Sequence, residues 1–303
     1  MEFDVVGLGV STIDLLHVVD RLPGTELVQK AKDSALSGGG PVATAVVAAA
    51  RLGARTAMLD RIGNDLFGRM IIDEYRAEGV DTTGIIVEEG STSSKASILV
   101  REKDGARAIT YSPGDAGDLA PEQVRGDIVS SSRILHLNGR HWGASLHAAR
   151  LAKEAGVSVS FDGGAHRYQP GHRELMPLVD ICIVAAEYAA SFTGKTGIDA
   201  AADAILQSGP KVVAVTSGKD GSWIFSRQGE RFHQKAYEVG TVVDTTGAGD
   251  AYHGAFLFAL ARGFSLETAA TYAGAAGALN TRALGGRCAL PTLPELETFL
   301  RAR

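Results

Sequence analysis

The spacing of apolar residues changes repeatedly along the chain, and these changes predict strands followed by helices. Short apolar runs, typical of buried strands, cover residues 3–8, 56–60, 134–137, 157–161, 181–184 and 212–216. Segments with apolar residues at helical spacing alternate with them, over 42–53, 65–77, 144–155, 172–177, around 188, and over 200–206. Such alternation predicts an α/β protein with a mainly parallel sheet and helices on both faces.

Two regions depart from this rhythm. Residues 95–101 and 107–111 are alternating segments that flank Lys103-Asp104-Gly105, a hairpin signal, so we expect a small inserted β element. Residues 222–225 and 230–237 predict an antiparallel pair at the sheet edge. The C-terminal part is expected to be helical, over 249–262, 266–282 and 294–301.

The segment 242–250 combines a strand end, a turn of small residues and a helix start. Free N–H groups at a helix start attract anions, and Gly247, Ala248 and Gly249 let a phosphoryl oxygen approach them. Asp250 would repel a bound phosphate unless it accepts a proton from a hydroxyl that attacks this phosphate. The alternative is that Asp250 only complements the helix dipole.

Two segments near the N-terminus are candidates for sugar binding. Asp14 comes after strand 3–8, at the edge where open α/β sheets bind ligands, and its carboxylate can accept two hydroxyls; a turn cap is the alternative. Gly38, Gly39 and Gly40 precede Pro41, which suits the first position of a helix. These glycines let a ligand press against the backbone, or they form a flexible connector.

Composition narrows the function classes. The chain has 303 residues, 45% of them hydrophobic, and a formal net charge of -5, which does not favour a nucleic-acid partner. No apolar run approaches a membrane span and no leader pattern opens the chain, so we expect a cytoplasmic protein without a membrane partner. Metal-dependent and serine hydrolysis are not indicated, because neither His-Glu-x-x-His nor Gly-x-Ser-x-Gly occurs.

Taken together, these segments resemble the ribokinase-like sugar kinases, also called the phosphofructokinase B family, over essentially the whole chain. The resemblance is carried by 39–45, 51–53, 61–68, 216–218 and above all 244–250. It implies a three-layer α/β/α fold with a mainly parallel sheet, in which residues 1–303 form one domain. It also implies a β lid, contributed by about 15–36 and 94–112, that covers the sugar and forms a homodimer interface.

The resemblance also assigns site residues. It implies that Gly247, Ala248 and Gly249 form the anion hole and that Asp250 is the catalytic base. The positions that match the sugar site are Asp14, Gly39, Gly40 and Thr44. Those that match the loop and helix beside ATP are Thr216, Gly218, Gly221 and Gly274. The implied cofactors are ATP and Mg²⁺, with K⁺ as a further cation between Asp244, Thr246 and residues 285–286.

Two departures concern the substrate and the magnesium ion. Thr44 stands where the family usually has Asn, and Ala185 and Tyr188 stand where it has Asn-x-x-Glu, with Glu187 out of register. The family's route for organising Mg²⁺ and phosphate is therefore open in this chain. Within the family, residues 38–45 and 281–287 look most like those of the sulfofructose kinases.

The sequence thus predicts an ATP-dependent kinase that transfers the γ-phosphoryl group to a primary hydroxyl of a ketose-like sugar. A ribokinase or nucleoside kinase of the same fold is a rival, and the latter would need a base-stacking side chain, for which Tyr111, Trp142 and Phe161 are the aromatic candidates. A non-catalytic sugar or nucleotide sensor is the other rival. It would have no reason to keep an acid at position 250.

The acceptor is the open point. In the sulfofructose kinases a lysine, an asparagine and an arginine meet the anionic group, whereas this chain offers Arg140 after strand 134–137, with Val28 and Thr110 at the other two positions. One contact poorly compensates a buried charge, which favours a neutral, fructose-like ketose. Lys30 and Arg167 keep an anionic sugar open as the alternative.

Overall fold

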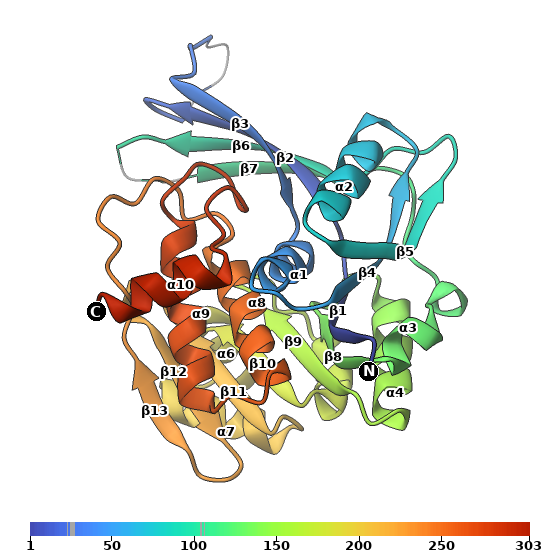
Figure 1. The fold of residues 1–303 in the computed structure, drawn as a ribbon, viewed down its shortest axis with the longest axis vertical. Coiled ribbons are helices and arrows are strands. Elements are labelled where there is room, and N and C mark those ends of the chain that lie inside the picture. The colour runs from blue at the N-terminus through green and yellow to red at the C-terminus, as the bar shows by residue number, and fades with distance from the viewer. Residues whose placement is uncertain (23, 25–27, 104, 106) are drawn as a thin grey trace.

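The computed structural model describes residues 1–22, 24, 28–103, 105 and 107–303, and its main feature is a nine-stranded sheet (Figure 1). The strand order is β13-β12-β11-β10-β9-β8-β1-β4-β5. All neighbours are parallel except β11–β12 and β12–β13. The strands are β1 (Phe3–Leu8), β4 (Thr56–Gly63), β5 (Val80–Glu88), β8 (Ser132–Leu137), β9 (Ser158–Gly163), β10 (Ile181–Ala185), β11 (Val212–Thr216), β12 (Ser222–Ser226) and β13 (Arg231–Gln234).

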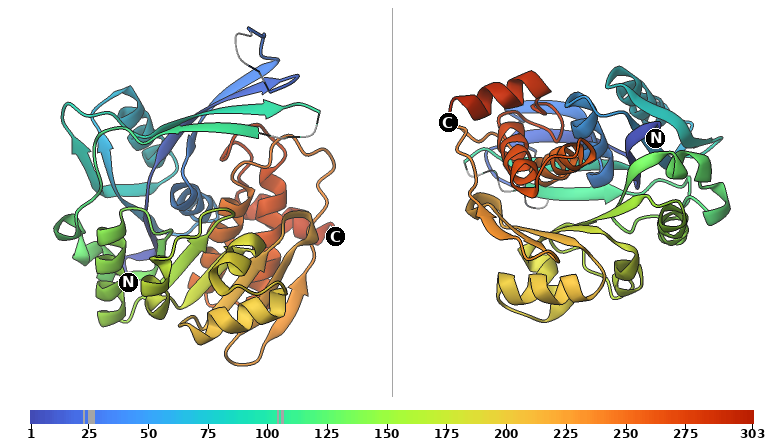
Figure 2. Two further views of the ribbon diagram at one scale, coloured as in Figure 1. Left: turned by 180° about the vertical axis from the view of Figure 1, so that it is seen from behind. Right: turned by 60° about the horizontal axis from the view of Figure 1, so that its bottom comes forward.

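Helices cover both faces of this sheet, as Figure 2 shows from two further sides. One apolar cluster joins it to α4 (Trp142–Glu154), α5 (His172–Leu175), α6 (Ala186–Thr193) and α7 (Ile198–Gln207), with the short α3 (Gly126–Ser130) beside them. On the opposite face lie α1 (Pro41–Arg51), α8 (Ala248–Ala261), α9 (Leu266–Asn280) and α10 (Leu293–Arg301). α2 (Leu66–Ala77) packs with α1 in a further cluster. The three-layer fold class is confirmed.

A second, four-stranded sheet rises from the carboxyl edge of the large one (Figure 1). Its order is β3-β2-β6-β7, formed by β2 (Thr12–Val19), β3 (Asp33–Gly39), β6 (Lys95–Arg101) and β7 (Arg107–Ser112). Residues 23 and 25–27 of the predicted lid, and Asp104 of the predicted hairpin turn, lie outside the described residues. That this sheet acts as a lid, and that the whole chain is one domain, stay predictions.

Several elements differ from the sequence-based expectation at the sheet edges. β5 was not predicted, because Asp81, Thr82, Thr83 and Gly84 interrupt its apolar residues; it is an edge strand that is only partly buried. β13 is shorter than the predicted 230–237 and also lies at an edge. A strand at a sheet edge buries fewer of its side chains than a central strand does, so its apolar residues form a weaker pattern in the sequence.

The segments predicted to carry chemistry follow the carboxyl ends of the parallel strands. Residues 138–141 follow β8, residues 164–167 follow β9, and residues 217–221 follow β11. α8 begins at the same edge and is buried along most of its length, because it lies between α1, α9 and the sheet. None of the helices in the described part of the chain is long and apolar enough to cross a bilayer.

Candidate active site

The start of α8 has the backbone geometry of an anion hole. Gly247 is its N-cap with φ 73°, and a Cβ there would overlap the backbone of Gly286, so only glycine fits without strain. Gly249 differs, because among the described atoms none beyond its chain neighbours and its own helix backbone lies within 4 Å of the position that its Cβ would take. The start of α8 at Gly249 therefore adjoins open space at the positive end of the helix dipole, while the Ala248 N–H donates to the Thr245 carbonyl at 3.3 Å.

Asp250 stands in the first turn of α8, beside this space. Burial raises its pKa to about 6, and the charges of Asp162 and Asp14 act in the same direction. Arg167 and Arg287 oppose the shift. A carboxylate with a pKa near 6 is ionised at neutral pH yet basic enough to accept a proton from a hydroxyl, as a general base must.

Asp14 lies on β2 and its charge is felt by Asp250, so the two acids approach the same space. Its carboxylate accepts a hydrogen bond of 2.8 Å from Thr12 Oγ1, and burial raises its pKa. Gly39 lies directly against this carboxylate, where a Cβ would overlap its atoms. Gly40 has φ 90° and no room for a Cβ beside the carbonyl of Val10, so these glycines pack closely rather than forming a flexible connector.

Tyr111 and Arg140 extend the Asp14 side of the site. Asp14 pairs with Ala96, and Ala96 with Tyr111, so all three side chains share one row on one face of the small sheet. The guanidinium of Arg140 lies over the Tyr111 ring, 5.3 Å from its centroid. Thr110 points to the opposite face, as strand alternation requires.

Val28 and Lys30, which sequence reasoning compared with the lysine of a sulfonate site, do not lie beside Arg140 in the same way as Tyr111 does. Val28 is fully exposed, with 103% of its reference surface accessible, and Lys30 is also exposed. Arg107, which the sequence reasoning missed, is on the same face of β7 as Tyr111 and donates to Thr245 Oγ1 at 2.7 Å. This contact ties the small sheet to the loop that precedes the anion hole.

Arg287 is a second residue to which sequence reasoning gave no role in the site, although it lies in the segment 281–287 that was compared with the sulfofructose kinases. Its buried guanidinium donates to Thr44 Oγ1 at 3.1 Å and to the Gly39 carbonyl at 2.7 Å, and lies 3.1 Å from the Glu74 carboxylate. Thr44, expected to contact the sugar, is therefore also a partner of Arg287. The positive charge of Arg287 acts on both Asp14 and Asp250.

Asp162, on β9, is a further carboxylate whose charge acts on Asp250. Its buried carboxylate lies 3.4 Å from the Arg167 guanidinium and 3.5 Å from His253 Nε2. His253 stands one helical turn after Asp250 on α8. Tyr188 cannot replace the family's glutamate, because its hydroxyl bonds His172 Nδ1 at 2.9 Å within the apolar cluster. The described residues contain no group of three or more His, Cys, Asp or Glu side chains that could enclose a metal ion.

The predicted nucleotide residues surround the end of β11. Thr216 ends this strand, and Gly218 and Gly221 have φ values of 50° and 92°. At Gly221 a Cβ would overlap the backbone of Gln234, whereas Gly218 has open space. Gly274, on α9, lies beside the Tyr237 ring, which would be 3.5 Å from a Cβ at this position. Their contact with a nucleotide stays a prediction.

The predicted cation residues do lie together. Asp244 Oδ1 accepts hydrogen bonds from the N–H and Oγ1 of Thr246 at 2.9 and 2.8 Å, and its Oδ2 accepts one from the Gly285 N–H at 3.0 Å. Asn280 donates to the Gly286 carbonyl at 2.8 Å. These bonds fix the loop 285–286 against the turn that precedes α8. Binding of a monovalent ion here stays a prediction.

Known proteins resemble this chain along its whole length. A model described as pfkB family carbohydrate kinase matches residues 3–293. The chain belongs to the pfkB family of carbohydrate kinases. A 5-dehydro-2-deoxygluconokinase from Halalkalibacterium halodurans is 28% identical over 99% of this chain and 95% of its own. An ATP-dependent ribose-1-phosphate kinase from Halopiger xanaduensis is 29% identical over 99% and 98%.

Among solved structures, Arabidopsis thaliana ribokinase in complex with ribose and ATP superimposes with a TM-score of 0.86, at 25% identity over 99% of each chain. The predicted enzyme class, an ATP-dependent carbohydrate kinase, is thereby confirmed. The closer likeness to the sulfofructose kinases and the fructose-like substrate are not confirmed.

The aromatic candidates for base stacking separate in the structure. Phe161 is fully buried in the core, where it packs edge-on against His172. Trp142 begins α4, and its ring is 6.0 Å from that of His172. Of the three, Tyr111 alone lies on the Asp14 face of the small sheet, and its ring carries Arg140. This arrangement does not favour a nucleoside acceptor.

Proposed function

We propose that this carbohydrate kinase transfers the γ-phosphoryl group of ATP to a primary hydroxyl of a small sugar that carries an anionic group at its other end. Asp250 accepts the proton of the attacking hydroxyl while the new O–P bond forms and the bond to the β-phosphate oxygen breaks. The N–H groups of Gly247, Ala248 and Gly249 stabilise the charge of the transferred group. The raised pKa of Asp250 supports its role as the base.

Magnesium fits this site as an ion that arrives with the nucleotide. Mg²⁺ usually keeps several waters and uses one or two carboxylates plus the substrate phosphates, so a closed cage of side chains is not required. Asp162 supplies an oxygen donor of the right chemistry beside Asp250. Bound Mg²⁺ would neutralise charge on the phosphates. We place a potassium ion, on the resemblance alone, near Asp244 and the loop 285–286.

Dimerisation through the small sheet remains part of the proposal. Leu15 and Leu36 are register partners on the face away from Asp14, and their exposed fractions are 41% and 49%. A homodimer through this face would remove both side chains from water. Because β2 carries Asp14, such an interface would also brace the acceptor site.

The anionic acceptor rests on the position of Arg140. Its guanidinium lies over Tyr111, on the Asp14 face, and none of the carboxylates in the described part of the chain pairs with it. A planar donor fork that is oriented by an aromatic ring suits a carboxylate or phosphate. Two relatives support this choice, because their names specify a gluconate derivative and a sugar phosphate. The neutral, fructose-like ketose becomes the second candidate.

The test measures kcat/KM for 5-dehydro-2-deoxy-D-gluconate, ribose 1-phosphate, 6-sulfofructose, fructose 6-phosphate and fructose, with the wild type and Arg140→Ala. We expect one anionic sugar to exceed fructose by more than about tenfold, or about 1.4 kcal/mol of transition-state binding, and Arg140→Ala to remove this margin. Arg140→Lys should recover only part, because a point charge lacks the fork.

Arg150→Ala is the matched control, because Arg150 is an exposed arginine on α4 whose charge partner is Glu174, at 3.6 Å. Its kinetics should equal those of the wild type. A preference for fructose, or an anionic preference that survives Arg140→Ala, would contradict the proposed acceptor while leaving the kinase activity itself in place.

A further inference from the structure

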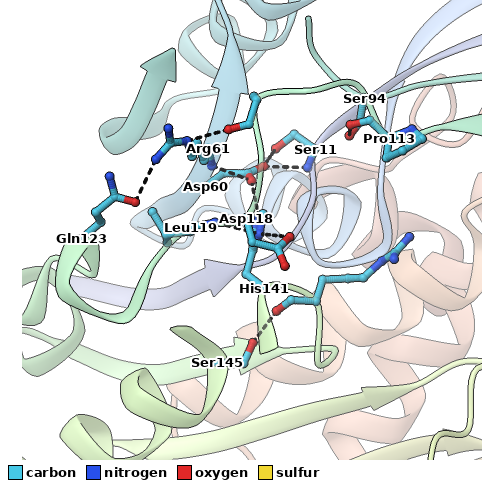
Figure 3. Close-up of polar contacts among 12 residues, drawn as sticks. Ser11, Asp60, Arg61, Ser94, Pro113, Asp118, Leu119, Gln123, His141 and Ser145 are labelled. Carbon is cyan, nitrogen blue, oxygen red and sulfur yellow. Dashed lines mark hydrogen bonds and ion pairs between the residues drawn. The ribbon is translucent and has the colours of Figure 1, made fainter. Parts of the chain in front are cut away.

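A buried pair, Asp60 and His141, connects the two sides of the acceptor site (Figure 3). His141 Nε2 donates to Asp60 Oδ1 at 2.8 Å, and both side chains are almost completely buried. Asp60 Oδ2 accepts from the N–H and the hydroxyl of Ser11, each at 2.6 Å, and Oδ1 also accepts from the Arg61 N–H at 2.8 Å. Four donors thus satisfy one buried carboxylate, as a charge in the interior requires.

One end of this network leads to Asp14. Ser11 lies between β1 and β2, three residues before Asp14, and Thr12 donates to the Asp14 carboxylate at 2.8 Å. The Ser11 hydroxyl also lies 2.6 Å from the Tyr75 hydroxyl on α2, whose pKa burial raises to about 12. Asp60 therefore fixes the chain segment that carries the acid of the sugar site.

The other end leads to Arg140. His141 follows it directly and has φ 49°, a left-handed conformation that few side chains adopt without cost. The Arg140 carbonyl accepts from Ser145 Oγ at 2.5 Å, and its N–H donates to Asn138 Oδ1 at 3.1 Å. The main chain of Arg140 is therefore held by its neighbours in the loop and by the anchored ring of His141.

A third contact reaches the segment that returns from the small sheet. His141 Nδ1 lies 3.1 Å from both the Leu119 N–H and the Asp118 carboxylate, in the stretch after β7. Burial lowers the pKa of His141, but the bonds to Asp60 and Asp118 outweigh it and raise the pKa overall. Nδ1 accepts from the Leu119 N–H in the neutral ring, whereas in the charged ring it donates to the Asp118 carboxylate instead. Either bond links β4 to this segment.

We propose that Asp60 and His141 are positioning residues, which hold Arg140 at a fixed separation from Asp14 and thereby set the length of the anionic sugar that the site accepts. This inference rests on the proposed role of Arg140. Neither residue reaches the anion hole in the described contacts, so they should act on acceptor binding and not on phosphoryl transfer.

The first variant is His141→Asn, because Asn tolerates the left-handed backbone and is too short to reach Asp60. With the anionic sugar that the wild type prefers among the five named above, we expect KM to rise about tenfold while kcat changes less than about twofold. KM for ATP should stay constant. The isosteric Asp60→Asn serves as the second variant, with the same expected split.

His147→Asn is the control, since His147 also lies near the start of α4 and is only partly buried. The decisive measurement repeats His141→Asn in an Arg140→Ala background. If His141 acts through Arg140, its substitution has no further effect once Arg140 is removed. The acceptor KM of the double variant should therefore differ from that of Arg140→Ala by less than about twofold. Melting temperatures of all variants separate this result from general unfolding.

Two outcomes would overturn the inference. In one, His141→Asn and Asp60→Asn fold but leave the acceptor KM unchanged although Arg140→Ala raises it. In the other, their effect persists in the Arg140→Ala background or extends equally to kcat and the KM for ATP, which indicates a structural role alone. If Arg140→Ala itself leaves acceptor kinetics unchanged, the proposed acceptor role of Arg140 fails first, and the two failures are distinguishable.

Discussion

The proposed phosphate end and the proposed acceptor end of this site are built in different ways. The phosphate end consists of consecutive residues, 247–250, whose backbone N–H groups and single carboxylate come from one helix turn. The acceptor end draws Asp14 from β2, Tyr111 from β7 and Arg140 from the loop after β8. Local backbone serves the first end, and side chains from distant segments serve the second.

This difference follows from what each end must recognise. The phosphoryl donor of a kinase always presents the same group, and backbone amides at a helix start suit it without help from a particular side chain. Acceptors differ in length and charge, and a side-chain site can follow them by single substitutions. At Thr44, where the family usually has Asn, the side-chain hydroxyl accepts a hydrogen bond from Arg287 at 3.1 Å.

The largest expected effect concerns the one side chain that the phosphate end does need. Asp250→Asn removes the proton acceptor but keeps the shape of the helix start, so kcat should fall by about 10²–10⁴-fold while the KM values for sugar and ATP change little. Steady-state kinetics with the preferred acceptor measure this. Turnover close to the wild type would show that the base lies elsewhere and that Asp250 only complements the helix dipole.

The next effect separates two glycines of the same turn. Gly249→Val places a side chain in open space beside the helix start, so the protein should fold while kcat falls by about 10²–10³-fold, because the phosphoryl group loses its place. Gly247→Val should instead lower the melting temperature, because φ is 73° and the new side chain would overlap Gly286.

Circular dichroism melts and steady-state kinetics of both glycine variants provide the measurement, with Gly263→Ala as a control for a left-handed glycine at the far end of α8. An active Gly249→Val variant would place the transferred group away from this turn.

The contrast between the two ends also explains how far sequence reasoning reached. Roles for Gly247, Ala248, Gly249 and Asp250 could be predicted because their chemistry is contiguous. Those roles stay predictions, whereas the helix start at this turn is confirmed. The same holds for α1, which begins at Pro41, and for α8, which Gly263 follows with φ 78°. Local rules of helix starts and ends fixed these features.

The acceptor end could be predicted only in part, because its geometry depends on strand register and on burial. Nothing near Arg287 in the sequence indicates that it faces Thr44 and Gly39, which are more than two hundred positions away. The contact between Asp60 and His141 was likewise not predicted, because the two residues are 81 positions apart in the sequence. Thr110 was compared with a ligand residue of the sulfofructose kinases, yet its side chain points away from Asp14.

The smallest expected effect concerns the stability of the folded protein. It tests whether ionised Asp250 lowers the free energy of unfolding. Burial raises the pKa of Asp250 from 3.8 to about 6, so its ionisation costs the folded state stability. This cost is absent below about pH 4, grows between pH 4 and 6, and is complete above pH 6. The Asp250→Asn variant carries no charge at this position at any pH, so it does not incur this stability cost.

We therefore expect Asp250→Asn to melt higher than the wild type at pH 8, by about 2–4 °C for each 1 kcal/mol of relieved cost, and the difference to vanish as the pH falls towards 4. Thermal unfolding of both proteins from pH 4 to 8 measures it, and all other groups cancel in the difference. If Asp250 only complemented the helix dipole, the sign would reverse, because the variant would lose a favourable charge at the start of α8. A lower melting temperature of the variant at pH 8 would thus contradict a raised pKa of Asp250, whatever the kinetics of the variant.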